Sequence, residues 1–245
     1  VAMFLDGKCF GEDEMILALG GTIEGEKILL GFVQSGTENE RVCREFLRGL
    51  VDRGLRYQQG LLCVMDGSKG LKAAVSQVFG HYARIQRCQW HKRENIVRYL
   101  PKSKQELFRN KLRRAYALPT YAETKSALLK IRKELEILNA HAAASLDEGM
   151  EETLTLHHLG VFEKLGDSFK TTNCLESINA LLGQRTDKID YWVNSGQKQR
   201  WIATALLDIE PALRKVKGYR HLTLLRSALQ SQIQTEKEKN NRKVA

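Results

Sequence analysis

The sequence predicts an α/β fold built around a mixed sheet, and its apolar runs are the main evidence. Residues 1–5, 15–20 and 27–33 are apolar runs of strand length, and the turn-like segment 23–26 joins the second run to the third as an antiparallel hairpin. The run LLCVM at 61–65 is continuously apolar, which is typical of a buried strand. These runs predict the strands of one sheet.

Helices are predicted between these strands. Residues 37–54 carry apolar side chains at helical spacing and end in a glycine, which suits a helix C-terminus. A second helix is expected from about 68 to 79, and a short strand at 83–86 follows it. The order strand, hairpin, helix, strand, helix, strand predicts an α/β sheet of mixed direction.

Strand signals stop between about residues 92 and 164. Pro101 and Pro119 divide this stretch into helical segments, and the alanine-rich segment 140–145 favours helix. Another amphipathic helix is expected over 197–216. The predicted organisation is therefore a first part of the core (1–98), an all-helical insertion (99–166), a second part of the core with C-terminal helices (167–229) and a frayed, disordered tail (230–245).

Composition narrows the class of protein. A hydrophobic content of 42% and a charged content of 28% are ordinary for a globular protein, and no apolar run approaches the ~18 residues that span a bilayer. Five scattered cysteines argue against a disulfide framework and favour a reducing cytoplasm. The first residues lack the zones of a signal peptide, and the chain does not begin with Met. We therefore expect a cytoplasmic protein without a membrane segment, trimmed at its N-terminus.

Positive charge is concentrated in one stretch. Residues 84–133 contain 15 Lys or Arg against 3 Glu, whereas residues 134–168 contain 1 Lys against 8 acidic residues. A solvated basic face is the simplest explanation of such a run, but the local charge is large. Nucleic-acid backbones are the commonest partner for such a stretch, and an acidic protein or an anionic lipid surface is the alternative.

Two aspartates follow strand-like runs in the same way. Asp6 in FLDG and Asp66 in VMDG each come after apolar residues and before a glycine. Side chains at the carboxyl ends of strands project into the crevice where α/β proteins bind ligands. Neighbouring carboxylates repel unless a proton or a cation lies between them, and Mg²⁺ or Mn²⁺ suits such oxygen ligands. Asp-Gly on its own is an ordinary turn signal.

The segment 168–182 (SFKTTNCLESINALL) contains a third acidic residue. Asn173 can cap a helix, and Glu176 would then be the N3 residue of a capping box. Apolar residues recur at i, i+3 and i+7 from Leu175, while Glu176 and Asn179 line a polar strip beside them. The segment alone leaves two interpretations of Glu176 open, a helix cap or a member of a reactive site.

Cys88 and His91 have the C-x-x-H spacing of metal ligands. A structural zinc site needs four ligands, and His157, His158 and Cys174 supply the others only if distant segments converge. A Cys–His nucleophilic pair needs an orienting third group, which the sequence does not identify. The interpretation we favour is a buried Cys88 and a hydrogen-bonded His91 near the acidic site.

Five blocks of sequence together resemble the bacterial Mutator-type transposases of insertion sequences. These are FLDGK, VMDGSKGLKAA, QRCQWHKREN, TTNCLESINAL and RWIATALL, which occur in the family's order. The resemblance extends from Asp6 to about Leu225. It implies a ribonuclease H-like catalytic core with an all-helical insertion before the last catalytic acid.

The resemblance also implies the site and its cofactor. The three catalytic DDE acids, which would hold two Mg²⁺ or Mn²⁺ ions, fall on Asp6, Asp66 and Glu176. One ion would activate water or a DNA 3′-hydroxyl as nucleophile, and the other would stabilise the leaving oxygen. The family's other matching positions are supporting residues Cys88, His91, Asn173 and Asn179.

The activity implied is DNA cleavage and strand transfer at the ends of an insertion sequence. The implied partners are double-stranded DNA, as transposon ends and target, and further copies of the chain in a homo-oligomer, with no membrane, in the bacterial cytoplasm at the nucleoid. A ribonuclease H-like nuclease and a non-catalytic DNA-binding descendant are the alternatives. The expected DNA-binding residues are Arg87, Lys92, Arg93, Lys111, Arg113, Arg114, Arg200 and Trp201.

One departure from the family concerns the N-terminus. Family members carry a DNA-binding region ahead of the first aspartate, whereas only five residues precede Asp6 here. We therefore expect the choice of DNA sequence to depend on a region outside this chain, and activity to depend on its presence.

Overall fold

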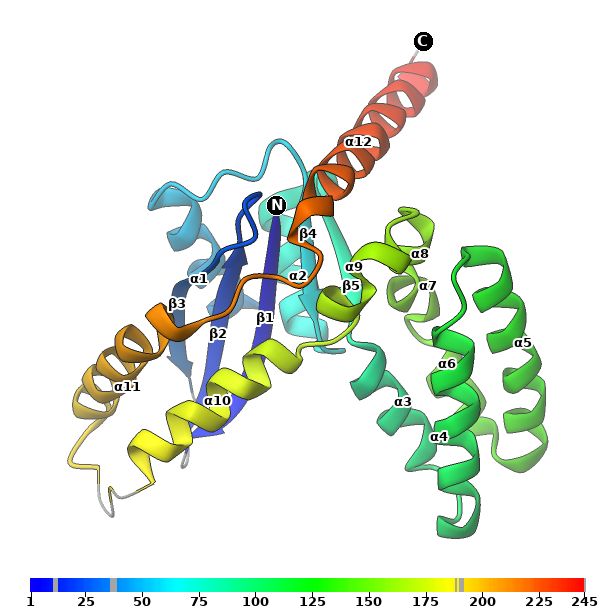
Figure 1. The fold of residues 1–245 in the computed structure, drawn as a ribbon, viewed down its shortest axis with the longest axis horizontal. Helices are drawn as coiled ribbons and strands as arrows, with labels where there is room; N and C mark the ends of the chain where they lie inside the picture. Colours follow the sequence, from blue (N-terminus) through cyan, green and yellow to red (C-terminus); the bar gives the residue numbers. More distant parts are fainter. Residues whose placement is uncertain (11–12, 36–38, 188, 190–191, 245) are drawn as a thin grey trace.

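One five-stranded sheet organises the computed structural model, which describes residues 1–10, 13–35, 39–187, 189 and 192–244 (Figure 1). The strand order is β3-β2-β1-β4-β5; β1, β2 and β3 form an antiparallel meander, and β4 and β5 run parallel to β1. The predicted mixed sheet is confirmed. The strands are β1 (Ala2–Phe10), β2 (Asp13–Gly21), β3 (Lys27–Ser35), β4 (Leu61–Met65) and β5 (Ala83–Arg87).

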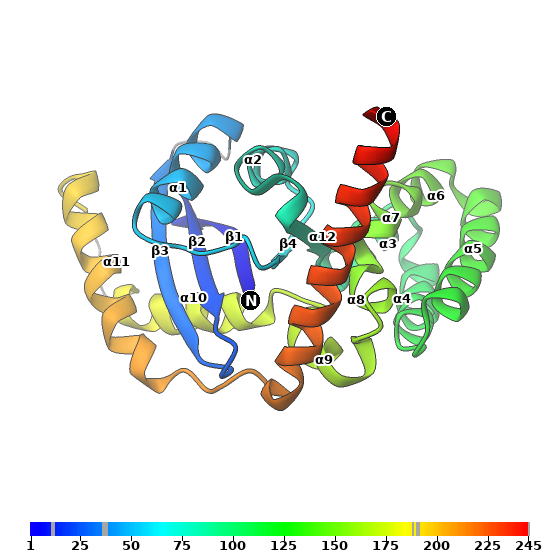
Figure 2. The same ribbon diagram turned by 90° about the horizontal axis from the view of Figure 1, so that it is seen from above.

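Two helices cover one face of the sheet (Figure 2). Helix α1 (Glu40–Asp52) begins where the side chain of Asn39 accepts a hydrogen bond from the Val42 N–H, and α2 (Lys69–Phe79) begins in the same way at Ser68. Both helices pack their apolar sides with residues of β1, β2 and β4 in one buried cluster. A 3₁₀ turn, η1 (Gly80–Tyr82), connects α2 to β5.

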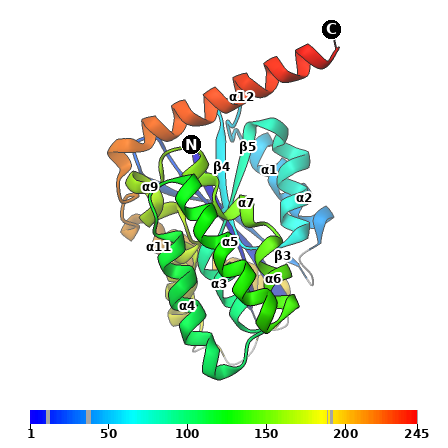
Figure 3. The same cartoon turned by 90° about the vertical axis from the view of Figure 1, so that its right-hand side faces the viewer.

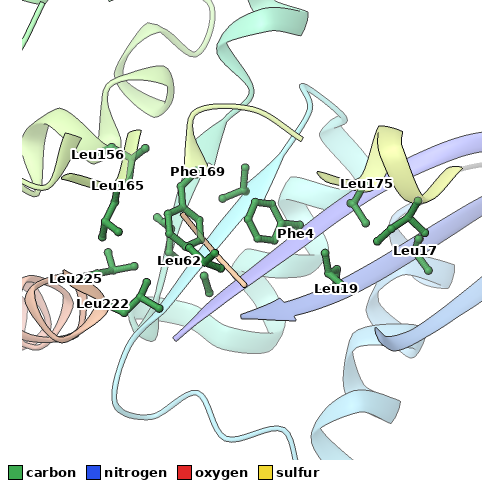
Figure 4. Close-up of a cluster of buried hydrophobic side chains, with 14 of the residues drawn as sticks. Phe4, Leu17, Leu19, Leu62, Leu156, Leu165, Phe169, Leu175, Leu222 and Leu225 are labelled. Atoms are coloured by element: carbon green, nitrogen blue, oxygen red, sulfur yellow. The ribbon is translucent and has the colours of Figure 1, made fainter. Parts of the chain in front are cut away.

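The opposite face packs against the C-terminal half of the chain. Its apolar cluster joins β1, β2 and β4 to α8 (Thr155–His158), α9 (Phe162–Phe169), α10 (Asn173–Thr186), α11 (Ser195–Ile209) and the start of α12 (Leu222–Val244). Phe4 of β1 and Phe169 of α9 lie at its centre, where their rings stack with centroids 5.4 Å apart (Figure 4). This cluster fixes α10 on the sheet.

A separate group of helices stands beside the β5 edge (Figure 3). It contains α3 (Gln89–Val97), α4 (Lys102–Tyr116), α5 (Tyr121–Leu138), α6 (Ala140–Asp147) and α7 (Met150–Thr153). These helices have an apolar cluster of their own, with members from Ile96 to Leu154. Pro101 precedes α4, and Pro119 lies between α4 and α5, as predicted. Residues of α8 and α9 belong to the cluster on the sheet instead.

The C-terminal segments differ from the sequence prediction. The helix expected over 197–216 ends at Ile209, because Pro211 lies in the 3₁₀ turn η2 (Glu210–Ala212) and cannot continue an α-helix. A second 3₁₀ turn, η3 (Tyr219–His221), leads into α12. The tail predicted to be frayed is helical as far as Val244, and buried residues such as Leu225 and Leu229 hold the first half of α12 on the core. No helix in the described ranges is both long and apolar enough to cross a membrane.

The Phe4–Phe169 stack predicts a large loss of stability on truncation. Both rings are fully buried, so Phe169→Ala removes a ring from the centre of the cluster that holds α9 and α10 on the sheet. We expect the free energy of unfolding to fall by about 3–5 kcal/mol. Urea unfolding measures this loss. The control Leu224→Ala, whose side chain is 51% exposed on α12, should change it by less than about 0.5 kcal/mol.

Candidate active site

The pairing of β1 with β4 sets the positions of the two aspartates. The parallel register ends at Leu5 opposite Met65, so Asp6 and Asp66 are the next residues of neighbouring strands. The sequence predicted that Asp6 follows the end of its strand, but β1 continues to Phe10 because Asp6 and later residues pair with β2. Asp6 is only 7% exposed. It therefore lies where β1 leaves β4 while it still pairs with β2.

The turn after β4 holds Asp66 in place. Its Oδ1 atom accepts a hydrogen bond of 2.9 Å from the Ser68 N–H, so Asp66 also has the turn role that its Asp-Gly sequence suggests. The guanidinium of Arg87 packs closely over Gly67, so a Cβ at this position would displace the end of that side chain.

Helix α10 carries Glu176, and its first turn differs from the predicted capping box. Thr172 is the N-cap and Asn173 is the first helical residue, which moves Glu176 from position N3 to N4. Among the described residues no hydrogen bond joins the Glu176 carboxylate to a backbone N–H, and its Oε1 atom is buried without a hydrogen-bond partner. Asn179 is buried one turn later, while Asn173 is exposed. The geometry of this turn removes the capping interpretation of Glu176.

His91 of α3 lies near Glu176 and feels the charges of Asp6 and Asp66. Its Nε2 atom lies 3.9 Å from Glu176 Oε1. The interaction with the Cys88 thiol and the charges of Asp6 and Asp66 raise the pKa of His91 to about 9, although burial acts in the opposite direction. Burial raises the pKa of the Cys174 thiol in the first turn of α10, and the charge of Asp6 adds to this rise. The raised pKa favours the imidazolium form of His91 near neutral pH, with the Glu176 carboxylate as its neighbour.

Cys88 is buried at the start of α3, directly after β5. Burial raises the pKa of its thiol, but the interaction with His91 outweighs burial, and the net shift is downward. The zinc alternative is not supported, since His157 contacts the Leu118 carbonyl and His158 contacts Gln232. Within the described ranges no three His, Cys, Asp or Glu side chains are grouped as metal ligands. Cys88 and His91 form a pair beside the acids.

Two of the residues expected to bind DNA are buried instead. Arg87 and Lys92 both pair with Glu148, with their nitrogens 3.2 and 3.3 Å from its Oε2 atom. The Lys92 side chain is 0% exposed, and burial lowers its pKa to about 8. Neither side chain can reach a phosphate in this arrangement. They connect β5 and α3 to the loop before α7, and so tie the helical group to the sheet.

The other predicted DNA-binding residues lie on two surfaces. Lys111 is paired with Glu134, and Arg93 donates from Nε to Glu94. Arg113 and Arg114 are exposed near the end of α4. Arg200 and Trp201 are exposed on α11, away from this group. The structure therefore leaves a smaller basic surface than the sequence suggested.

Trp90 is a residue that the sequence analysis did not single out. It lies between Cys88 and His91, is 41% exposed, and its ring packs edge-on against His91 with centroids 4.8 Å apart. A tryptophan within the basic segment QRCQWHKREN was a signal available in the sequence. It places an open aromatic ring next to the acids.

Known proteins can now be compared with this geometry. The family model described as "Transposase, Mutator family" matches residues 6–214, which is most of the chain. The chain belongs to the Mutator family of transposases. The match begins at Asp6 and includes Asp66, Glu176 and the Cys88–His91 pair.

Several transposases are similar to this Mutator-family chain. The transposase for insertion sequence element IS256 in transposon Tn4001 of Staphylococcus aureus is 27% identical over 79% of this chain and 48% of its own length. The transposase for IS905 of Lactococcus lactis is 27% identical over 78% of this chain and 48% of its own length. The transposase for IST2 of Acidithiobacillus ferrooxidans is 28% identical over 73% of this chain and 60% of its own length. The chain thus spans about half the length of the first two relatives.

Burial of Lys92 predicts a change of stability with pH. The unfolded chain keeps this proton up to the ordinary pKa of 10.5, whereas the folded chain releases it near pH 8. Between these two pKa values the unfolded state therefore binds more protons than the folded state. The free energy of unfolding that Lys92 contributes consequently increases as pH rises. Relative to Lys92→Met, the parent should gain up to about 3 kcal/mol between about pH 7 and pH 10.5.

Urea unfolding of parent and variant across this pH range measures the difference. Lys102→Met is the control, because Lys102 is exposed at the start of α4 and no buried charge is removed. A difference between parent and Lys92→Met that stays constant with pH would contradict the assignment.

Proposed function

We propose that this chain is the catalytic region of an insertion-sequence transposase, in which Asp6, Asp66 and Glu176 are the DDE acids. The observation that carries the proposal is the position of His91, which is 3.9 Å from Glu176 and is acted on by the charges of both aspartates. One small side chain thus links acids that are up to 170 residues apart in sequence. The match to the Mutator family supports the same assignment.

We propose a ribonuclease H-like core for the sheet and its flanking helices. The family resemblance implies such a core with a helical insertion before the last acid. The mixed five-stranded sheet and the helical group between β5 and α10 support this. The division into 1–98, 99–166 and 167–229 remains our proposal, with the qualification that α8 and α9 pack with the sheet.

Two divalent cations, Mg²⁺ or Mn²⁺, fit the chemistry of these residues. The site offers carboxylate oxygens, and Glu176 Oε1 is buried without a hydrogen-bond partner, which is costly unless a proton donor or a cation reaches it. Asp6, Asp66 and Glu176 would hold the ions, although within the described part of the chain these three side chains are not grouped as metal ligands. When bound, such ions activate the attacking hydroxyl and stabilise the leaving 3′-oxygen of a phosphodiester.

The chain's own groups prepare this region for an anionic substrate. The Cys88 thiol and the charges of Asp6 and Asp66 raise the pKa of His91 above its ordinary value, so its positive charge offsets negative charge beside the acids. Glu176 lies in the first turns of α10, where the backbone dipole favours negative charge. The proposed substrate is double-stranded DNA at transposon ends and target, and the proposed assembly is a homo-oligomer in the bacterial cytoplasm, at the nucleoid.

Two other functions make different predictions. A ribonuclease H-like nuclease uses the same acids but gives no strand-transfer product. A non-catalytic DNA-binding descendant binds DNA equally well without metal and cleaves under no condition. The retention of all three acids around His91 favours the transposase over the descendant.

Glu176→Gln tests the catalytic assignment. The amide keeps the shape of the side chain but lacks the charge that holds a divalent cation against phosphate. We expect cleavage and strand transfer to fall by about 10²-fold or more while the thermal midpoint changes little. The measurement is a Mg²⁺- or Mn²⁺-dependent assay on DNA that carries the element's ends, with a thermal melt on the same sample.

The matched control is Glu163→Gln, an exposed glutamate on α9 that should leave both readouts unchanged. If Glu176→Gln cleaves like the parent, Glu176 is not a catalytic acid and the DDE proposal fails.

Replacement of Lys111, Arg113 and Arg114 by Gln tests the basic surface on α4. Loss of phosphate contacts should weaken DNA binding to all sequences alike and flatten its dependence on salt. Each lost contact lowers the slope of log affinity against log salt by about 0.9, and Lys111 should contribute least because Glu134 already neutralises it. Binding to an unrelated duplex over a series of salt concentrations measures the slope.

A triple variant of Arg41, Arg48 and Arg56 is the control, because it removes the same charge from exposed positions in α1 and the following loop. Equal effects of the two triple variants would show that net charge, rather than the α4 surface, governs binding.

A further inference from the structure

A pocket of about 210 Å³ lies beside the proposed active site, at the junction of α3, the end of α4 and the segment before α10. Trp90 and Tyr116 line it with aromatic rings, and Arg93, Arg113 and Lys170 line it with positive charge. None of its lining residues is acidic. Its volume is below the ~300–1,000 Å³ of sites for drug-sized ligands and suits a single ring system.

The pocket is connected directly to the catalytic residues. Trp90 packs against His91, which is 3.9 Å from Glu176. On the other wall, the Gln89 N–H donates a 2.9 Å hydrogen bond to the Lys170 carbonyl, two residues before the N-cap of α10. A DNA strand whose phosphate lies at the acids therefore has a neighbouring nucleotide within reach of Trp90.

The aromatic lining suits a nucleotide base, because the Trp90 ring is exposed on one side of the pocket and the Tyr116 ring is buried on the other. Trp90 is 41% exposed, so its ring can be covered by a ligand. Tyr116 is buried and its hydroxyl is shielded from solvent, so it presents ring carbon atoms. Bases stack on such rings irrespective of their sequence, provided that they are not paired in a duplex.

The charged lining suits the phosphate of the same nucleotide. Arg93 uses Nε for Glu94, and Arg113 uses one Nη atom for Asn110, so each guanidinium has further N–H groups available. Lys170 is 3.2 Å from Asp167 and remains partly exposed. Positive charge with an aromatic ring is the combination that proteins use for single-stranded nucleic acid.

We propose that this pocket binds one unpaired nucleotide of the DNA strand next to the reacting phosphate, with its base stacked on Trp90. The inference rests on the proposed function, since DNA is the assumed substrate. It adds a positioning site for a strand that has been separated from its complement at the transposon end.

Binding without divalent metal tests the pocket separately from catalysis. The probes are an oligothymidylate of about 12 nucleotides and a duplex of equal length, both with chelator present, and the full chain is used. We expect Trp90→Ala to bind the single strand roughly 5- to 150-fold more weakly, and to bind the duplex like the parent. Trp90→Phe should keep most of the single-strand affinity, because it retains a ring.

Tyr99→Ala is the matched control, because Tyr99 is 45% exposed just after α3 and does not line the pocket. A second measurement does not depend on a variant: 2-aminopurine placed in an unpaired end of a duplex should lose fluorescence when the parent chain binds, and less so with Trp90→Phe. Unchanged single-strand affinity in Trp90→Ala, equal losses on both probes, or no quenching in the parent would each overturn the proposal.

A failure of the pocket proposal can be told apart from a failure of the proposed transposase function. Stacking on Trp90 without any cleavage in Mg²⁺ supports the pocket and contradicts the catalytic assignment. Cleavage that depends on Glu176, with no contribution of Trp90 to binding, supports the transposase and removes the pocket.

Discussion

The register of β1 against β4 is the constraint on which the rest of the site depends. Parallel pairing that ends at Leu5 and Met65 brings two aspartates to the same level of neighbouring strands. Side chains alternate between the faces of a strand, so a shift of one residue would send one carboxylate to the opposite face. Phe4 and Phe169 help to fix this register, because the stacked rings lock β1 to the helices that cover it.

Much of the fold could be predicted because its signals are local. The hairpin, the buried β4 strand and the proline-bounded helices each follow from a few adjacent residues. The continuation of β1 past Asp6 could not, since it depends on pairing with β2, and the helical end of the chain depends on burial of Leu225 and Leu229 against the core. These are tertiary effects, which sequence periodicity does not encode.

The sequence singles out candidate members of the site, whose roles remain a proposal, but it does not indicate the ion pairs around them. Spacing and resemblance identified the acids and the Cys88–His91 pair. Nothing in the sequence indicated that Glu148, more than 50 residues away, pairs with both Arg87 and Lys92. The net charge of a segment is counted without regard to ion pairs, and here it overstated the exposed positive charge of residues 84–133. The two cations of this cluster are buried while the Glu148 side chain is half-exposed, and the cluster joins β5 and α3 to the loop before α7.

The helical group leaves the sheet after β5 and returns before α10, and the Gln89–Lys170 hydrogen bond holds these two points together. Its apolar cluster is separate from the clusters on either face of the sheet. An inserted unit with adjacent ends and its own core can lengthen, shorten or be exchanged during evolution with little effect on its host. Changes of length or sequence in the helical group should therefore leave the sheet, and with it the positions of Asp6 and Asp66, largely unaltered.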